Sequence, residues 1–136
     1  MPRILLQRAI SLGATFGFLG VAGGAFGAHA LKAVLQPDML QVFEVGIRYQ
    51  LYHALALVAV GLVGRDMPRR PFEIAAAAYV LGILLFSGSL YMMALSGIRW
   101  IGAVTPLGGV SCLVGWASLA YGAWDRTRTS GAGPDG

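Results

Sequence analysis

Four long apolar stretches alternate with short polar connections along the chain. An α-helix needs about 20 predominantly apolar residues to cross a hydrocarbon layer about 30 Å thick. Short connections make successive helices antiparallel neighbours. The pattern therefore predicts an all-α membrane protein with four transmembrane helices in an antiparallel bundle. The predicted spans cover approximately residues 9–28, 47–64, 73–96 and 100–124.

A different pattern precedes the second span. Between Leu31 and Ile47, polar residues recur every three or four positions, and apolar residues occupy the other face. This spacing predicts a short amphipathic helix before the second span, with Asp38 after Pro37 as its N-cap. The helix is expected either to lie in the membrane interface or to lead directly into the span.

Composition agrees with a membrane location and leaves no room for a soluble module. Hydrophobic residues make up 57% of the chain and charged residues only 12%, whereas a soluble domain carries about 25% charged residues. We expect residues 1–125 to form a single transmembrane domain and residues 126–136 to be a disordered cytoplasmic tail. The first apolar stretch is too long for a signal peptide, so we expect it to be retained as a span.

Basic residues predict the orientation of the chain. Seven arginines lie at the N-terminus, in the second connection and in the C-terminal tail, against three basic residues in the first and third connections. The positive-inside rule then places both termini in the cytoplasm. The basic residues sit at segment ends and form no basic face with interleaved aromatics, so nucleic acid is not an expected partner. The single cysteine, Cys112, excludes an intramolecular disulfide.

Glycines recur at four-residue intervals along the first span. Small residues at this spacing let two membrane helices approach closely. The neighbour is either another helix of the same chain or the first span of a second copy, and the spacing does not decide between them. The candidate packing residues are Gly13, Gly17, Gly20, Gly24 and Gly27.

The fourth span is framed by Trp100 and Trp124, which are expected to mark the two membrane interfaces. Within it, Thr105 and Pro106 are followed by Gly108 and Gly109. Because a proline lacks the backbone N–H, this segment is predicted to bend the helix.

Candidate chemistry is confined to the two histidines, since the acidic residues avoid the middle of every span. His29 ends the first span, and His53 begins the second from the same side, so the two imidazoles are expected at similar depth. Tyr49 and Gln50 share a helix face with His53. This polar cluster could fasten two helices, could relay protons or bind a polar ligand, or could hold haem or a metal. We expect no cofactor, because two ligands fall short of a stable metal site.

Several segments resemble a family of small bacterial inner-membrane proteins typified by YgdD and YwdK, which has a eukaryotic relative. The resemblance is carried by Gly24–Lys32, Tyr49–Leu57, Leu85–Tyr91 and Thr105–Gly109. It implies four spans in the bacterial cytoplasmic (inner) membrane and no known activity. It also implies that His29, Lys32, Tyr49, Gln50 and His53 belong to the shared core of the family.

Three classes of function follow. The first is a non-enzymatic structural or accessory membrane protein, with lipid and either a second copy or another membrane protein as partner. The second is a small transporter or channel that uses the polar cluster around His53. The third is a membrane enzyme or redox carrier, although the sequence contains no catalytic motif.

Overall fold

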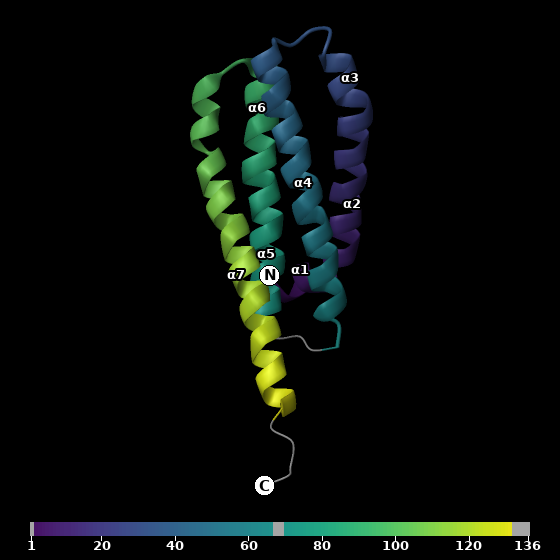
Figure 1. The fold of residues 1–136 in the computed structure, drawn as a ribbon, viewed down its shortest axis with the longest axis vertical. Coiled ribbons are helices and arrows are strands. Elements are labelled where there is room, and N and C mark those ends of the chain that lie inside the picture. Colours follow the sequence, from purple (N-terminus) through teal and green to yellow (C-terminus); the bar gives the residue numbers. More distant parts are fainter. Residues whose placement is uncertain (1, 67–69, 132–136) are drawn as a thin grey trace.

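The computed structural model describes residues 2–66 and 70–131, with side chains described as far as residue 125. Within these residues the regular structure is helical, and four helical segments are long and apolar enough to cross a membrane (Figure 1). They run antiparallel to one another in chain order, as predicted. Their bounds are Ala9–Leu31, Pro37–Val63, Arg70–Ser96 and Arg99–Asp125.

Three of the four segments are interrupted by a short stretch of non-α helix. The first and third contain π-helical turns, which arise where an extra residue is accommodated in a helix and frequently occur at functional sites. The elements in chain order are α1 (Pro2–Gln7), α2 (Ala9–Ala22), η1 (Gly23–Gly27), α3 (Ala28–Leu31), α4 (Pro37–Val63), α5 (Arg70–Gly82), η2 (Ile83–Ser87), α6 (Gly88–Ser96), η3 (Arg99–Ala103) and α7 (Thr105–Gly131).

Helix α4 and the third segment form the centre of the bundle. Helix α2 packs chiefly against α4, and α7 packs chiefly against α5 and η2. The share of residues buried within the chain differs between the most apolar parts of the four spans. It is 44% in the second span and 50% in the third, but only 17% in the first and 17% in the fourth. The outer faces of the first and last spans are therefore left for lipid or for another protein.

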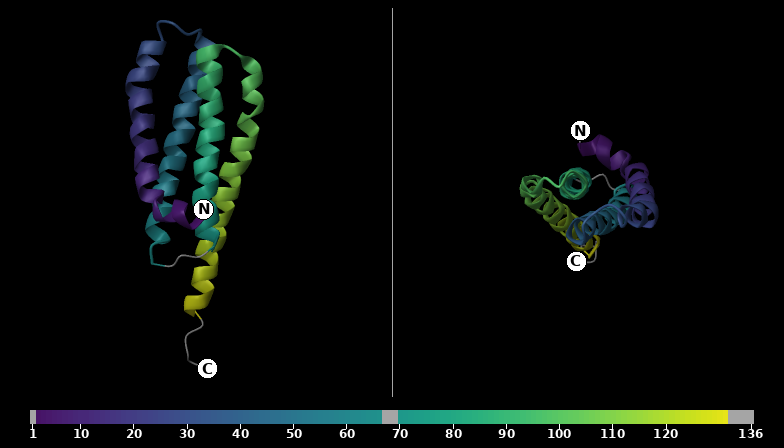
Figure 2. Two further views of the ribbon diagram at one scale, coloured as in Figure 1. Left: turned by 180° about the vertical axis from the view of Figure 1, so that it is seen from behind. Right: turned by 90° about the horizontal axis from the view of Figure 1, so that it is seen from above.

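The sequence did not predict the short helix α1. It runs along the side of the bundle near the lower end, next to the start of α5, and it contacts α5 (Figures 1 and 2). Leu6 on α1 is buried in the main hydrophobic core, together with Leu57 of α4 and Phe72 of α5. The core therefore lies nearer to this end of the molecule.

The predicted amphipathic helix and the second span form one continuous helix, α4. Gln36 occupies the N-cap position with extended backbone, and Pro37 is the first helical residue, where a missing N–H costs nothing. Asp38 therefore lies in the first turn rather than at the cap. Its carboxylate accepts a hydrogen bond from Arg99 at 2.7 Å, and both side chains are exposed.

The structure replaces the predicted bend in the fourth span with a change of helix type. Residues Arg99–Ala103 form the 3-10 turn η3, and α7 begins at Thr105. Pro106 is therefore in the first turn, where its missing N–H breaks no helical hydrogen bond. The chain bends at Val104, directly before Thr105 and Pro106.

The predicted disordered tail is partly helical, since α7 continues to Gly131. A long helix propagates at low cost once nucleated. The remainder of the predicted tail, residues 132–136, and the middle of the second connection, residues 67–69, lie outside the described residues.

Candidate functional site

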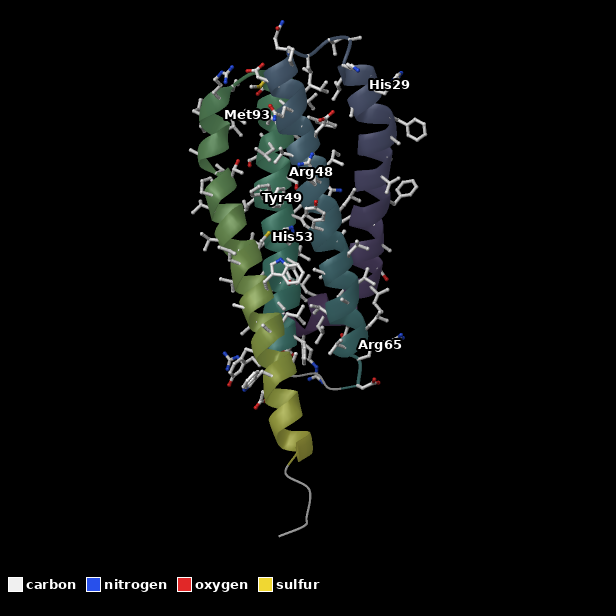
Figure 3. The ribbon with its side chains drawn as sticks, in the orientation of Figure 1. His29, Arg48, Tyr49, His53, Arg65 and Met93 are labelled. Carbon is white, nitrogen blue, oxygen red and sulfur yellow. The ribbon has the colours of Figure 1, made fainter. Side chains whose placement is uncertain are left out.

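The structure separates the two histidines instead of bringing them together. Gly20 of α2 is level with Leu51 of α4, and Gly27 is level with Phe43. By the same register His29 is level with about residue 41 of α4, which is about 18 Å along the axis from His53 at 1.5 Å per residue. Figure 3 shows His29 near the loop end and His53 half-way along α4. The two imidazoles cannot share a haem or a metal ion.

His29 and Lys32 lie at the exposed end of the first span. Both are exposed, and Lys32 follows the last turn of α3. They stand apart from Tyr49, Gln50 and His53, which lie in the middle of α4. The predicted five-residue cluster is thus two separate groups. Within the described residues, no group of three or more metal-ligating side chains comes together.

His53 is buried, and both of its ring nitrogens have partners. Nδ1 lies 2.7 Å from the carbonyl oxygen of Tyr49, one turn earlier in α4. Nε2 lies 3.2 Å from the indole nitrogen of Trp116 on α7. An indole N–H can only donate, so Nε2 must accept and must carry no proton. Nδ1 then carries the proton and donates it to the Tyr49 carbonyl, which makes the ring neutral.

Aromatic rings surround this imidazole and fill the space between α4 and α7. Tyr79 of α5 lies 5.7 Å from the His53 ring and 5.4 Å from that of Trp116, measured between ring centroids. Tyr49 stacks on His53 at 6.2 Å and also contacts Phe86 at 4.9 Å. Aromatic pairs at these separations add favourable packing energy. The rings therefore hold α4, α5, η2 and α7 together at one level.

Gln50 connects three helices through its amide. The side-chain nitrogen donates to the carbonyl oxygen of Phe16 on α2 at 2.8 Å, and Oε1 accepts from the Tyr91 hydroxyl on α6 at 2.7 Å. The Gln50 side chain is buried, with 6% of its surface exposed. A buried amide costs free energy unless its hydrogen bonds are satisfied, and here the partners come from the first and third spans.

Three serines make further helix-to-helix hydrogen bonds. The Ser87 hydroxyl of η2 donates to the carbonyl of Gly46 on α4 at 2.7 Å. The Ser111 hydroxyl of α7 donates to the carbonyl of Ala78 on α5 at 2.8 Å. Ser89 and Thr105 share a hydrogen bond of 2.7 Å between α6 and the start of α7. Each bond joins two helices that are neighbours in the bundle.

An apolar groove opens beside Gln50, between α2, α4 and the third span. Its volume is about 370 Å³. Phe16, Phe43, Ile47 and Ile83 are among its lining residues, and Gln50 and Tyr91 line it as well. Because Gln50 and Tyr91 are bonded to each other, their polar atoms are already occupied, and the groove presents a hydrocarbon surface.

The glycines of the first span divide into two sets. A Cβ on Gly13 would lie 2.7 Å from the carbonyl oxygen of Ala54, and one on Gly20 would lie 2.8 Å from the Leu51 side chain. Gly24 and Gly27 likewise face Ile47 and Phe43 of α4, at 3.2 and 3.4 Å. Gly17 has no neighbour within 4 Å. Four of the five predicted packing glycines therefore face another helix of the same chain.

Two of the most connected residues were missed in the sequence. The sequence pattern does not single out Trp116, because it marks only the ends of the span, at Trp100 and Trp124. An indole N–H in mid-membrane nevertheless requires an acceptor. Tyr91 was noted only as part of a family segment. Its position four residues after Ser87 indicates a shared helix face, and the two side chains contact α4 at Gln50 and Gly46.

Comparisons with known proteins agree with this architecture. Residues 23–109 match the family model described as "Protein of unknown function (DUF423)". A UPF0382 membrane protein of Staphylococcus saprophyticus is 44% identical over 115 residues, which are 83% of this chain and 93% of that protein. The UPF0382 membrane protein YwdK of Bacillus subtilis is 40% identical over 116 residues, 84% of this chain and 94% of its own length.

A third relative shows a similar degree of identity. The UPF0382 inner membrane protein YgdD of Escherichia coli is 41% identical over 107 residues, covering 79% of this chain and 82% of that protein. No solved structure is a significant match. The similarity covers about four fifths of this chain and is strong enough to establish common descent.

Proposed function

The chain belongs to the DUF423 family of UPF0382 membrane proteins of unknown function, and from this premise we propose that it is a non-enzymatic structural or accessory protein of the bacterial cytoplasmic membrane. The observation that carries the proposal is the state of His53. This imidazole is the ionisable group best placed for chemistry inside the bundle, and both of its nitrogens are occupied by protein partners.

The hydrogen bonds of His53 leave it without a free lone pair or an available proton. A metal, a substrate or a transported proton would have to displace either the Trp116 indole or the Tyr49 carbonyl. Breaking a buried hydrogen bond and leaving one partner unsatisfied costs about 1–3 kcal/mol. The geometry therefore favours a fastening role over proton relay, and it gives no support to the transporter alternative.

Several other buried polar groups also join helices. Gln50 joins three helices, and Ser87 and Ser111 each join two. Hydrogen bonds between membrane helices average about 0.6 kcal/mol and reach about 1.7 kcal/mol. Such contributions fix the register of the helices. Because these polar groups bond to one another or to the backbone, they support the proposal that the role of the protein depends on its shape and its outer surface.

The outer surface of the bundle is suited to association with lipid or with other membrane proteins. The first and last spans are the least buried and carry exposed large apolar side chains, including Phe18, Phe26 and Leu113. We propose that these faces contact lipid and a second copy or another membrane protein. We also propose that both termini and the second connection are cytoplasmic, on the basis of the Lys and Arg distribution.

The imidazole of His53 provides the test, because the chain has only two histidines. The full chain would be labelled with 15N-histidine and its ring nitrogen shifts recorded in micelles at about pH 7. We expect one ring to be a pure Nδ1–H tautomer in slow exchange with water, and the exposed ring of His29 to show averaged tautomers. The variant Trp116→Phe should change the chemical shift of His53 Nε2 and leave the ring nitrogen shifts of His29 unchanged.

The opposite result would remove the basis of the proposal. If His53 were an imidazolium, or exchanged its proton with water as rapidly as His29, it would be available for relay. A role of His53 in proton transfer would then be favoured over a role in fastening the helices. The variant His29→Gln serves as the control, because it assigns the two sets of signals and removes only an exposed ring.

A further inference from the structure

A cavity of about 480 Å³ lies at the end of the bundle that carries both termini, where α1 turns into α2 and meets the end of α4. Its polar lining residues come from segments far apart in the sequence. Arg3 and Gln7 belong to α1, Ser11 to α2, and Arg65 follows α4. From this cavity we propose a site for the phosphate group of an anionic phospholipid, at the membrane face that we assign to the cytoplasm.

Two glycines create the cavity by allowing the α1–α2 corner to approach α4. A Cβ on Gly61 would lie 2.8 Å from the Ile10 side chain, and one on Gly64 would lie 2.7 Å from Leu6. The backbone of Arg8, at φ −100° and ψ 3°, departs from α-helical geometry and turns the chain at this point. Leu6 and Ile10 therefore form an apolar base, and the polar side chains stand around it.

The charge of the lining is positive. Arg3 and Arg65 both line the cavity, and among the residues that the structure describes no Asp or Glu does. Asp66 is adjacent to Arg65 in sequence but is not part of the lining. In the part of the chain that the structure describes, neither arginine forms an ion pair. Figure 3 shows Arg65 at the end of α4 remote from His29.

The donor set suits a phosphate. A guanidinium binds phosphate oxygens through two parallel N–H groups, and the Gln7 amide and the Ser11 hydroxyl can donate further hydrogen bonds. Basic pockets between helices on the cytoplasmic side are suited to anionic lipid headgroups. The lining also contains apolar Leu6 and Ile10 beside these donors.

The experiment compares the wild-type full chain with two double variants of equal charge. Arg3→Gln with Arg65→Gln removes both guanidinium groups of the cavity. Arg8→Gln with Arg70→Gln removes two arginines of the same end that do not line it. Each protein in neutral detergent would be titrated with dioleoylphosphatidylglycerol or dioleoylphosphatidylcholine, and bound lipid counted by native mass spectrometry. A separate arm adds inorganic phosphate as competitor.

We expect wild type to retain phosphatidylglycerol in preference to phosphatidylcholine. The cavity variant should bind phosphatidylglycerol about tenfold more weakly, and the control variant should match wild type. Displacement by millimolar inorganic phosphate would assign the site to phosphate itself, whereas no displacement would assign it to the lipid. Equal binding by all three proteins, or equal loss in both variants, would overturn the proposal, because either result means general surface attraction. Thermal unfolding of each variant establishes that it is folded.

Discussion

The hydroxyl of Tyr91 donates to Oε1 of Gln50 at 2.7 Å, which joins α6 to α4 in the interior of the bundle. The same amide donates onward to Phe16 of α2. The bonded side chains of Gln50 and Tyr91, from the second and third spans, thus hold the first span through the backbone of Phe16. This connection holds together the three helices that line the apolar groove.

Removal of the Tyr91 hydroxyl should therefore destabilise the protein. In Tyr91→Phe the Gln50 oxygen loses its donor, and we expect the free energy of unfolding in micelles to fall by about 0.6–1.7 kcal/mol. Tyr79→Phe is the comparison, because Tyr79 is buried and its hydroxyl lacks a hydrogen-bond partner among the described residues, whereas Tyr91 is half-buried and its hydroxyl is bonded. That variant should be neutral or slightly stabilising. Equal effects in the two variants would show that the Gln50 bond contributes nothing.

Two adjacent glycines on α7 should respond differently to the same substitution. A Cβ on Gly108 would overlap the backbone of Phe86, which cannot move without shifting the third span, whereas one on Gly109 would lie 3.8 Å from the Phe86 ring. Overpacking of this kind costs about 1–3 kcal/mol. We expect Gly108→Ala to lower the thermal midpoint by several degrees and Gly109→Ala to leave it nearly unchanged. Equal midpoints would mean that α7 does not pack closely against the backbone of Phe86 at Gly108.

The spans could be predicted because hydrophobicity and length alone determine them. The contact between His53 and Trp116 could not be predicted, since it depends on how α4 and α7 rotate about their axes and on the Tyr79 ring of α5, which packs against both side chains. The depth of His53 was misjudged for a simpler reason. The apolar pattern predicts that the second span begins near residue 47, whereas α4 begins at Pro37, which places His53 well inside the helix.

Pro106 illustrates a second limit. A proline inside a helix bends it, and a proline in the first turn is neutral. The sequence around Thr105 fits both cases equally. The deciding feature is the 3-10 turn η3, whose end at Ala103 starts a new helix at Thr105. Nothing in the local residue pattern separates this arrangement from a continuous helix with a bend.

The proposed orientation can be tested with topology reporters. Fusion of a reporter that is active only in the cytoplasm to the C-terminus should give full activity, and fusion within the first connection, near Val34, should give none. We expect this result because basic residues favour the cytoplasmic side. Activity at Val34 with none at the C-terminus would reverse the assignment, and it would also move the Arg3–Arg65 cavity to the outer face.

Gly17 distinguishes internal packing from self-association along the first span. A side chain at Gly13 would meet the Ala54 carbonyl, whereas Gly17 faces open space in the single chain. We therefore expect Gly13→Ala to lower the free energy of unfolding by about 1–3 kcal/mol and Gly17→Ala to have little effect. Gly17→Leu adds the bulk needed to separate two copies that meet at this face. If light scattering of the purified protein showed a dimer in wild type and a monomer in Gly17→Leu, the glycines of the first span would serve a homodimer as well as the fold. An unchanged mass would restrict their role to packing against α4.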